Sequence, residues 1–192
     1  MGRIVFGIVL GIAMVPVAVV AWLWFGNVPV AVADQPLPRE WMITGVPLRA
    51  RIDRELVKIP PLPANEDNLI AGAQVYRDQC AVCHGYHGKP SSIGPNMFPK
   101  APPLWEVHHF GAETIVGVSD DPPGETYWKV ANGIRLTGMP SYKLVLTDIQ
   151  MWQVSLMLAN ADKHLPPAAV EILLGPEPLA SAPVTVSAPV KK

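Results

Sequence analysis

The hydrophobic and polar positions divide the chain into four segments, and the first of them is apolar throughout. No charged residue occurs from Ile4 to Phe25, and a helix over these 22 residues would be about 33 Å long, enough to cross a hydrocarbon core of about 30 Å. Trp22 and Trp24 lie at its far end, where aromatic side chains mark a membrane interface. We therefore predict a transmembrane anchor over residues 1–27.

A cleaved secretory signal is the alternative interpretation of the same segment. Ala31-Val32-Ala33, just before Asp34, resembles the small-residue site at which signal peptides are cleaved. The hydrophobic region of a signal peptide is about 7–15 residues long, however, and this apolar stretch is longer. Its length therefore favours an anchor that is retained.

The second segment, residues 28–64, has no sustained period and is rich in proline. This composition predicts an extended tether. An ordered arm that packs along the following domain is the alternative. The prolines on which the prediction depends are Pro36, Pro38, Pro47, Pro60, Pro61 and Pro63.

The third segment, residues 65–166, has the spacing of amphipathic helices. Asn65 is a predicted N-cap, and apolar residues recur at helical spacing until His84-Gly85 stops the helix. Two more helices are predicted, over about residues 125–132 and 147–160, the second beginning with a capping box. The predicted fold class is therefore all-α.

The fourth segment, residues 167–192, begins at Pro166-Pro167 and consists largely of proline, alanine, serine and valine. Such a composition cannot bury enough apolar surface to fold, so we predict a disordered tail. The net charge of −1 and the lack of a basic block disfavour nucleic-acid binding.

Both cysteines of the chain occur in one motif, Cys80-Ala81-Val82-Cys83-His84. Two thiols three positions apart lie on one side of a helical turn, where each can form a thioether with a haem vinyl group. The adjacent His84 is then placed to bind the iron. A thiol redox pair or half of a zinc site is the alternative, but a redox pair does not require the histidine and His87 alone does not complete a zinc site. The motif therefore predicts one covalently bound haem c.

Residues 65–166 resemble the class I, mitochondrial-type cytochromes c, particularly small bacterial monohaem proteins with a membrane anchor. Gly72 and Tyr76 match the glycine and the aromatic residue that the family has eight and four positions before the first haem cysteine. The resemblance implies that the first and last helices cross at the glycine, with Tyr76 near Trp152 and Leu156. It also implies a small helical domain wrapped around the haem.

The resemblance further implies that Met139 is the second iron ligand, because Gly133 to Pro140 looks very like the family's methionine loop. Pro140 keeps Met139 out of helical geometry, and a bound thioether raises the reduction potential. His108-His109 would supply a second imidazole in the alternative, bis-histidine arrangement. The other methionines are disfavoured as ligands: Met151 and Met157 are predicted core residues, Met97 follows the haem motif too closely, and Met42 lies in the tether.

The surroundings of the predicted haem are less determined. The family's carbonyl partner of the ligand histidine belongs to a proline, for which Pro95 is slightly favoured over Pro102. The candidates for contacts with the haem propionates are Trp105, Arg135, Trp128 and Tyr142. The alternative is ordinary packing for the three aromatic side chains and a solvated charge for Arg135. Four lysines are candidates for a basic docking rim: Lys89, Lys100, Lys129 and Lys143.

These features predict a membrane-anchored carrier of single electrons between membrane-bound redox enzymes, without a small-molecule substrate. The haem domain is expected on the periplasmic side of the cell inner membrane, because the family's haem is attached after export. A cytochrome subunit of a larger dehydrogenase or reductase is one alternative. A haem enzyme or gas sensor with an open sixth iron position is another, and a non-haem thiol protein is the third.

Overall fold

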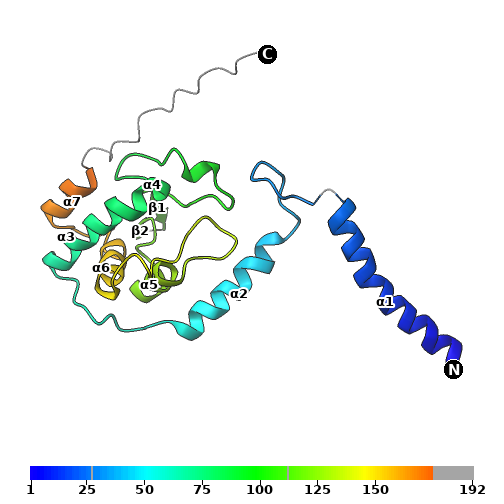
Figure 1. Ribbon diagram of the computed structural model, residues 1–192. Coiled ribbons are helices and arrows are strands. Elements are labelled where there is room, and N and C mark those ends of the chain that lie inside the picture. The colour runs from blue at the N-terminus through cyan, green and yellow to red at the C-terminus, as the bar shows by residue number, and fades with distance from the viewer. Residues whose placement is uncertain (27, 112, 175–192) are drawn as a thin grey trace, which may run out of the picture. The chain divides into compact units, whose positions relative to one another are not determined.

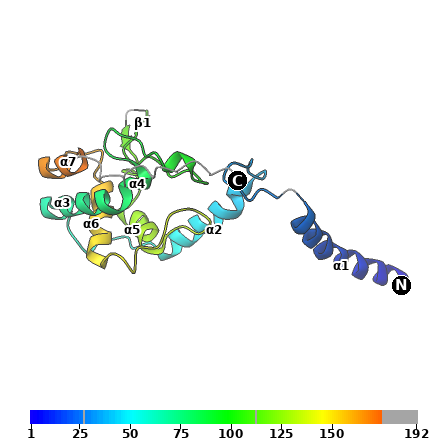
Figure 2. The ribbon, with the colours of Figure 1, turned by 45° about the horizontal axis from the view of Figure 1, so that its top comes forward.

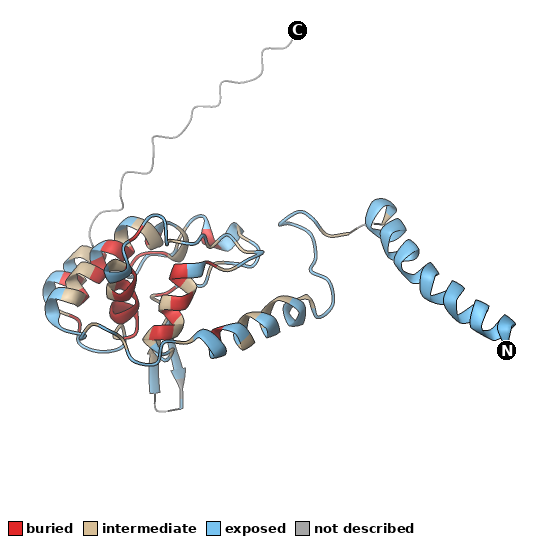
Figure 3. Ribbon diagram, turned by 60° about the horizontal axis from the view of Figure 1, so that its bottom comes forward, coloured by how far each residue is buried: buried red, intermediate tan, exposed pale blue. Residues whose placement is uncertain are grey.

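The computed structural model describes residues 1–26, 28–111 and 113–174, in two compact units, Met1–Met42 and the chain from Ile43 onward. The first unit contains α1 (Gly2–Phe25), a helix without a buried residue (Figures 1 and 3). This helix is long and apolar enough to cross a membrane, a test that a signal sequence also passes. The second unit is mostly helical, as the sequence predicted.

The prediction of an extended tether is wrong over Glu40–Glu55, which form helix α2 with Pro47 inside it. The C-terminal half of α2 has contacts that local sequence does not reveal. Ile52 is buried, and Trp128 Nε1 donates a hydrogen bond of 2.8 Å to Glu55 Oε2. Tertiary contacts therefore order this part of the segment, which corresponds to the ordered-arm alternative.

A continuous helical stretch leads to the cysteine motif through α3 (Glu66–Val75), a π-helical turn η1 (Tyr76–Cys80) and α4 (Ala81–His84). As predicted, the Asn65 side chain caps its start by accepting the backbone N–H of Asn68 at 3.0 Å. Gly85 ends it with a φ of 82°, a left-handed conformation that favours glycine. The sequence did not predict the π-helical turn.

The two other predicted helices are α5 (Pro123–Asn132) and α6 (Asp148–Leu158). The Thr147–Gln150 capping box is present, and Gly133, with a φ of 67°, follows the end of α5. Met151 and Met157 are buried core residues, as expected. Ile149, in the first turn of α6, is exposed, because α6 is buried only from Met151 onward.

The predicted crossing of the first and last helices of the domain is confirmed between α3 and α6 (Figures 1 and 2). A Cβ atom on Gly72 would lie 2.3 Å from the carbonyl oxygen of Gln153, so only a glycine permits this approach. Tyr76 shares the core with Leu156. In place of the expected contact with Trp152, the Tyr76 ring packs edge-on against Trp105, with 5.5 Å between the ring centroids. The Trp152 ring stacks on Tyr127, with 4.1 Å between the centroids.

Two strands and a C-terminal helix were also not predicted. Strands β1 (Val107–Phe110) and β2 (Glu113–Val116) form an antiparallel hairpin in which His109 pairs with Thr114. Helix α7 (Pro167–Leu174) packs against α3 and buries Ala169 and Leu173 (Figure 2). The disordered tail therefore does not begin at residue 167, since its first apolar residues complete the core. Residues 175–192 of the predicted tail lie outside the described residues.

Candidate haem site

Cys80 and Cys83 lie on successive turns at the junction of η1 and α4, both as free, half-buried thiols. Burial, reinforced by the nearby Cys83, raises the pKa of the Cys80 thiol to about 12. Reactive redox cysteines have lowered pKa values instead, because the thiolate is their nucleophile. The Cys80 thiol is therefore a poor nucleophile for thiol exchange, and its position beside Cys83 and His84 suits thioether attachment to a haem.

His84 is oriented by a backbone carbonyl, and that carbonyl belongs to Pro102. The distance from His84 Nδ1 to the Pro102 oxygen is 2.8 Å. Pro95, which the sequence slightly favoured, is therefore the wrong proline. Two residues after Pro102, the Leu104 N–H donates to the His84 carbonyl at 3.3 Å. The segment around Pro102 therefore contacts both the ring and the backbone of His84.

The Pro102 contact also determines which imidazole nitrogen is free. A carbonyl only accepts hydrogen bonds, so Nδ1 carries the proton and Nε2 keeps its lone pair. Burial lowers the pKa of His84, which favours the neutral ring that a metal requires. His84 is thus prepared as a metal ligand through Nε2.

The loop after the cysteine motif is fastened back onto that motif. Ser91 Oγ donates to the Val82 carbonyl at 2.6 Å and accepts the N–H groups of Ile93 and Gly94. A Cβ atom on Gly94 would lie 2.3 Å from the Cys83 carbonyl oxygen, so the two backbones are in close contact. Neither Ser91 nor Gly94 was singled out from the sequence, although a Ser-x-x-Gly turn after the motif was a signal for such a contact.

Met139 is half-buried against the hydrophobic core, in a loop with its own hydrogen bonds. Thr137 Oγ1 donates to the Ile134 carbonyl at 2.6 Å and accepts the Met139 N–H at 3.1 Å. The Met139 carbonyl in turn accepts the N–H of Ile134 at 3.2 Å. The backbone of Met139 is therefore held on both sides in a non-helical conformation, as a loop ligand requires.

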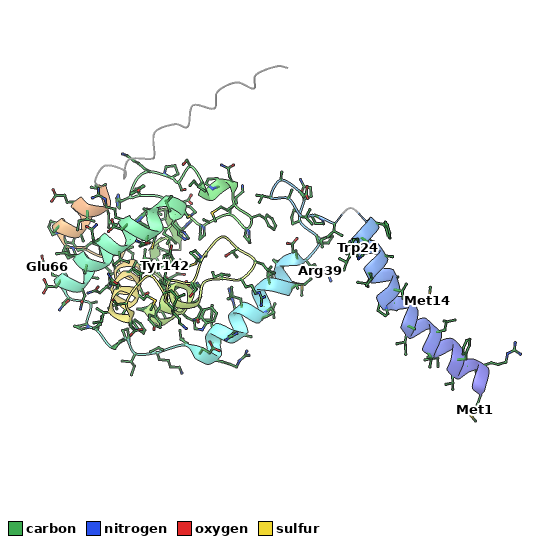
Figure 4. All side chains as sticks on the ribbon, in the orientation of Figure 1. Met1, Met14, Trp24, Arg39, Glu66 and Tyr142 are labelled. Carbon is green, nitrogen blue, oxygen red and sulfur yellow. The ribbon has the colours of Figure 1, made fainter. Side chains whose placement is uncertain are left out.

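Tyr142 connects the methionine loop to the helix that carries the cysteines. Tyr142, labelled in Figure 4, donates its hydroxyl to the Gln79 carbonyl at 2.9 Å and its N–H to the Val130 carbonyl at 3.1 Å. This contact replaces the propionate contact considered from the sequence. Its partner is a backbone atom next to Cys80, so no side-chain pattern in the sequence indicated the pairing.

The Trp105 side chain offers a polar group suited to a haem. Among the described residues, its buried Nε1–H is one of two buried side-chain groups without a hydrogen-bond partner. An indole N–H is a donor only, and a buried donor normally has an acceptor. A haem carboxylate would supply that acceptor, so the residues present fit the cofactor that the motif predicts.

Other sequence-based candidates are placed elsewhere. Trp128 donates to Glu55, and Lys129 forms ion pairs with Asp121 at 3.0 Å and Glu125 at 2.7 Å, which removes Lys129 from the expected basic rim. Arg135 is exposed. The alternative ligands His108 and His109 are exposed on strand β1.

Similarities to known proteins cover the part of the chain that contains this site. Residues 67–156 match the family model described as cytochrome C oxidase, cbb3-type, subunit III. The thiosulfate dehydrogenase of Stutzerimonas stutzeri (strain A1501) is 34% identical over 70 residues, which are 36% of this chain and only 22% of that relative. A reducing HAO-like protein complex of Kuenenia stuttgartiensis gives a TM-score of 0.39 at 21% identity, over 53% of this chain and 46% of that chain. The matched family model and relative, together with the cysteine motif, identify residues 67–156 as a c-type cytochrome domain.

Proposed function

We propose that this c-type cytochrome is a monohaem carrier of single electrons whose iron is bound by His84 and Met139. When bound, the haem supplies a one-electron couple between Fe(II) and Fe(III). Cys80 and Cys83 would hold it covalently, and Trp105 Nε1 would donate to one of its carboxylates. The observation that carries the proposal is the His84–Pro102 hydrogen bond of 2.8 Å, which leaves Nε2 free for the iron.

The second ligand determines the kind of chemistry. The Thr137 hydrogen bonds support Met139 as a ligand because they hold its backbone in a loop, where a long side chain can project. A site with both axial positions filled suits electron exchange and leaves no position for a substrate. The tie from Tyr142 to Gln79 would keep the methionine loop close to the helix of the cysteines during redox change.

We also propose that α1 anchors the protein in the cell inner membrane, with the haem domain on the periplasmic side. Its 24 residues and the lack of any buried residue in it support this proposal. An anchored domain meets membrane-bound donors and acceptors at a raised effective concentration. The expected partners are therefore membrane-bound redox enzymes.

A second candidate function is that of a cytochrome subunit in a larger oxidoreductase. The name of the matched family, an oxidase subunit, favours it. The thiosulfate dehydrogenase match does not extend that enzyme's activity to this chain, because it spans 22% of the relative. Purification of the detergent-solubilised protein would distinguish the two, since a subunit elutes with partner chains in fixed ratio and a free carrier elutes alone.

The ligand set is tested by replacing Met139 in the purified full-length protein. We expect Met139→Ala to convert the ferric iron from low to high spin and to allow the ferrous form to bind carbon monoxide. Met42→Ala, in the exposed part of α2, is the matched control and should keep the wild-type spectrum. A Met139→Ala spectrum identical to wild type would instead support the open-site alternative, and bare thiols by mass spectrometry would support the non-haem one.

A further inference from the structure

A second methionine contacts the loop of Met139. A Cβ atom built on Gly138 would lie 1.8 Å from Met97 Cε and 3.6 Å from Met97 Sδ, so the tip of the Met97 side chain occupies the space beside Gly138. Gly138 directly precedes Met139. The space beside Gly138, which has no side chain of its own, therefore holds the tip of a methionine side chain.

Met97 belongs to the loop that is attached to the cysteine motif. Ahead of it, Gly94 packs against the Cys83 carbonyl. Behind it, the Ala101 N–H donates to the Gly94 carbonyl at 3.2 Å, which closes the loop around Met97. Pro102 follows directly and accepts from His84. The base of Met97 thus lies in a loop that is held against Cys83 through Gly94 and that continues into Pro102, the partner of His84.

The Met97–Gly138 contact consequently joins the loop of one proposed iron ligand to the loop of the other. Hydrogen bonds restrain both loops internally, through Ser91 on the histidine side and Thr137 on the methionine side. Between these two loops, Met97 makes an apolar contact that is not a hydrogen bond. A thioether fills such an irregular gap well because it is unbranched and polarisable.

We propose that Met97 is a positioning residue for the sixth iron ligand. By filling the space beside Gly138, it holds the methionine loop against the histidine side and so opposes dissociation of Met139 from the iron. The inference rests on the proposed ligand set. Met97 follows the haem motif too closely to be a ligand itself, and the positioning role does not require it to bind iron.

The test is displacement of Met139 by imidazole in the ferric full-length protein, measured by absorption titration. We expect Met97→Ala to bind imidazole about tenfold more tightly, which corresponds to about 1.4 kcal/mol, close to half the value for burying a whole methionine. Met97→Leu preserves the side-chain volume and should stay within about threefold of wild type. Met42→Ala, exposed on α2, should have no effect.

Gly138→Ala provides a second and independent variant. Its Cβ would displace the Met97 tip, so we expect it to strengthen imidazole binding in the wild-type background. In the Met97→Ala background the same Cβ enters vacated space and should change the affinity by less than about twofold. Urea unfolding of each variant measures its general stability. A variant that has lost only the positioning of the ligand binds imidazole more tightly without a matching fall in its unfolding midpoint.

The outcomes are distinguishable. Equal effects of Gly138→Ala in the two backgrounds, or a wild-type imidazole affinity in Met97→Ala, would overturn the role of Met97 while leaving the proposed ligands in place. A wild-type protein whose ferric spectrum lacks sulfur ligation would overturn the ligand set and this inference together.

Discussion

Gly72→Ala should destabilise the domain even though alanine is the better helix former. Gly72 lies within α3, where replacing glycine by alanine ordinarily stabilises a helix by about 1 kcal/mol. A Cβ at this position would lie 2.3 Å from the Gln153 carbonyl oxygen and 2.8 Å from Met157 Cβ. A backbone carbonyl inside α6 cannot rotate away, so the two helices must separate.

The magnitude follows from that geometry. Ordinary van der Waals contact begins near 3.4 Å, so α3 and α6 must move apart by roughly 1 Å where they cross. Overpacking of a well-packed core costs about 1–3 kcal/mol, and the rigid carbonyl places this change at the upper end. After about 1 kcal/mol of helix propensity is subtracted, the free energy of unfolding should fall by about 2 kcal/mol.

Thermal unfolding of the purified holoprotein, followed by far-ultraviolet circular dichroism, measures this change. For a domain of about a hundred residues, a loss of about 2 kcal/mol lowers Tm by roughly 10 °C. Gly45→Ala is the matched control, because Gly45 also lies inside a helix but has nothing within 4 Å of its would-be Cβ. A Gly72→Ala protein as stable as the Gly45→Ala control would refute the close-crossing argument.

Two further predictions concern hydrogen bonds that hold loops to the domain. Tyr142→Phe removes the 2.9 Å bond to the Gln79 carbonyl and should lower the free energy of unfolding by about 1 kcal/mol in guanidinium titrations. Burial raises the pKa of Tyr142 from 10.0 to about 12. The stabilisation by its neutral hydroxyl is therefore complete below pH 10 and is lost as the pH rises toward 12. An identical dependence of unfolding on alkaline pH in Tyr142→Phe would contradict this. The hydrogen bond from Trp128 lowers the pKa of Glu55 below 4.5, so its charged form should hold α2 against the domain above that pH and release it as pH falls through the lowered value. Hydrogen exchange of residues 48–55 reports the release, and Glu55→Gln should exchange fast at neutral pH, whereas slow exchange in that variant would show that α2 docks without the carboxylate.

Local sequence determined the helices whose signals lie within a few residues. The Asn65 cap, the Thr147–Gln150 capping box and the stop at Gly85 all act through neighbouring backbone groups, so they are legible in the sequence and are present in the structure. The cysteine motif is similarly local, since three residues on one helical turn define the cofactor attachment. Resemblance to a family, rather than periodicity, supplied the crossing at Gly72.

Elements whose stability comes from distant partners were misjudged. Residues 40–55 have proline and little amphipathic pattern, yet they form a helix whose end is fixed by Trp128, far along the chain. Helix α7 begins at Pro167, directly after Pro166, where the composition predicts a tail, but its Ala169 and Leu173 complete the core beside α3. Propensity yields to such burial because packing contributes more than local preference.

By itself, the sequence determined which residues are chemically able to bind a haem and which helices carry them, because both depend on short-range spacing. Only the tertiary structure decided that Pro102 rather than Pro95 orients His84. It also decided that Tyr142 bonds the methionine loop to Gln79, and that the Met97 side chain fills the space beside Gly138. Each of these contacts joins segments that are well separated in sequence. Backbone carbonyls are alike at every residue, and the space beside a glycine is enclosed only when the loops meet. No pattern of residues could therefore have identified these contacts.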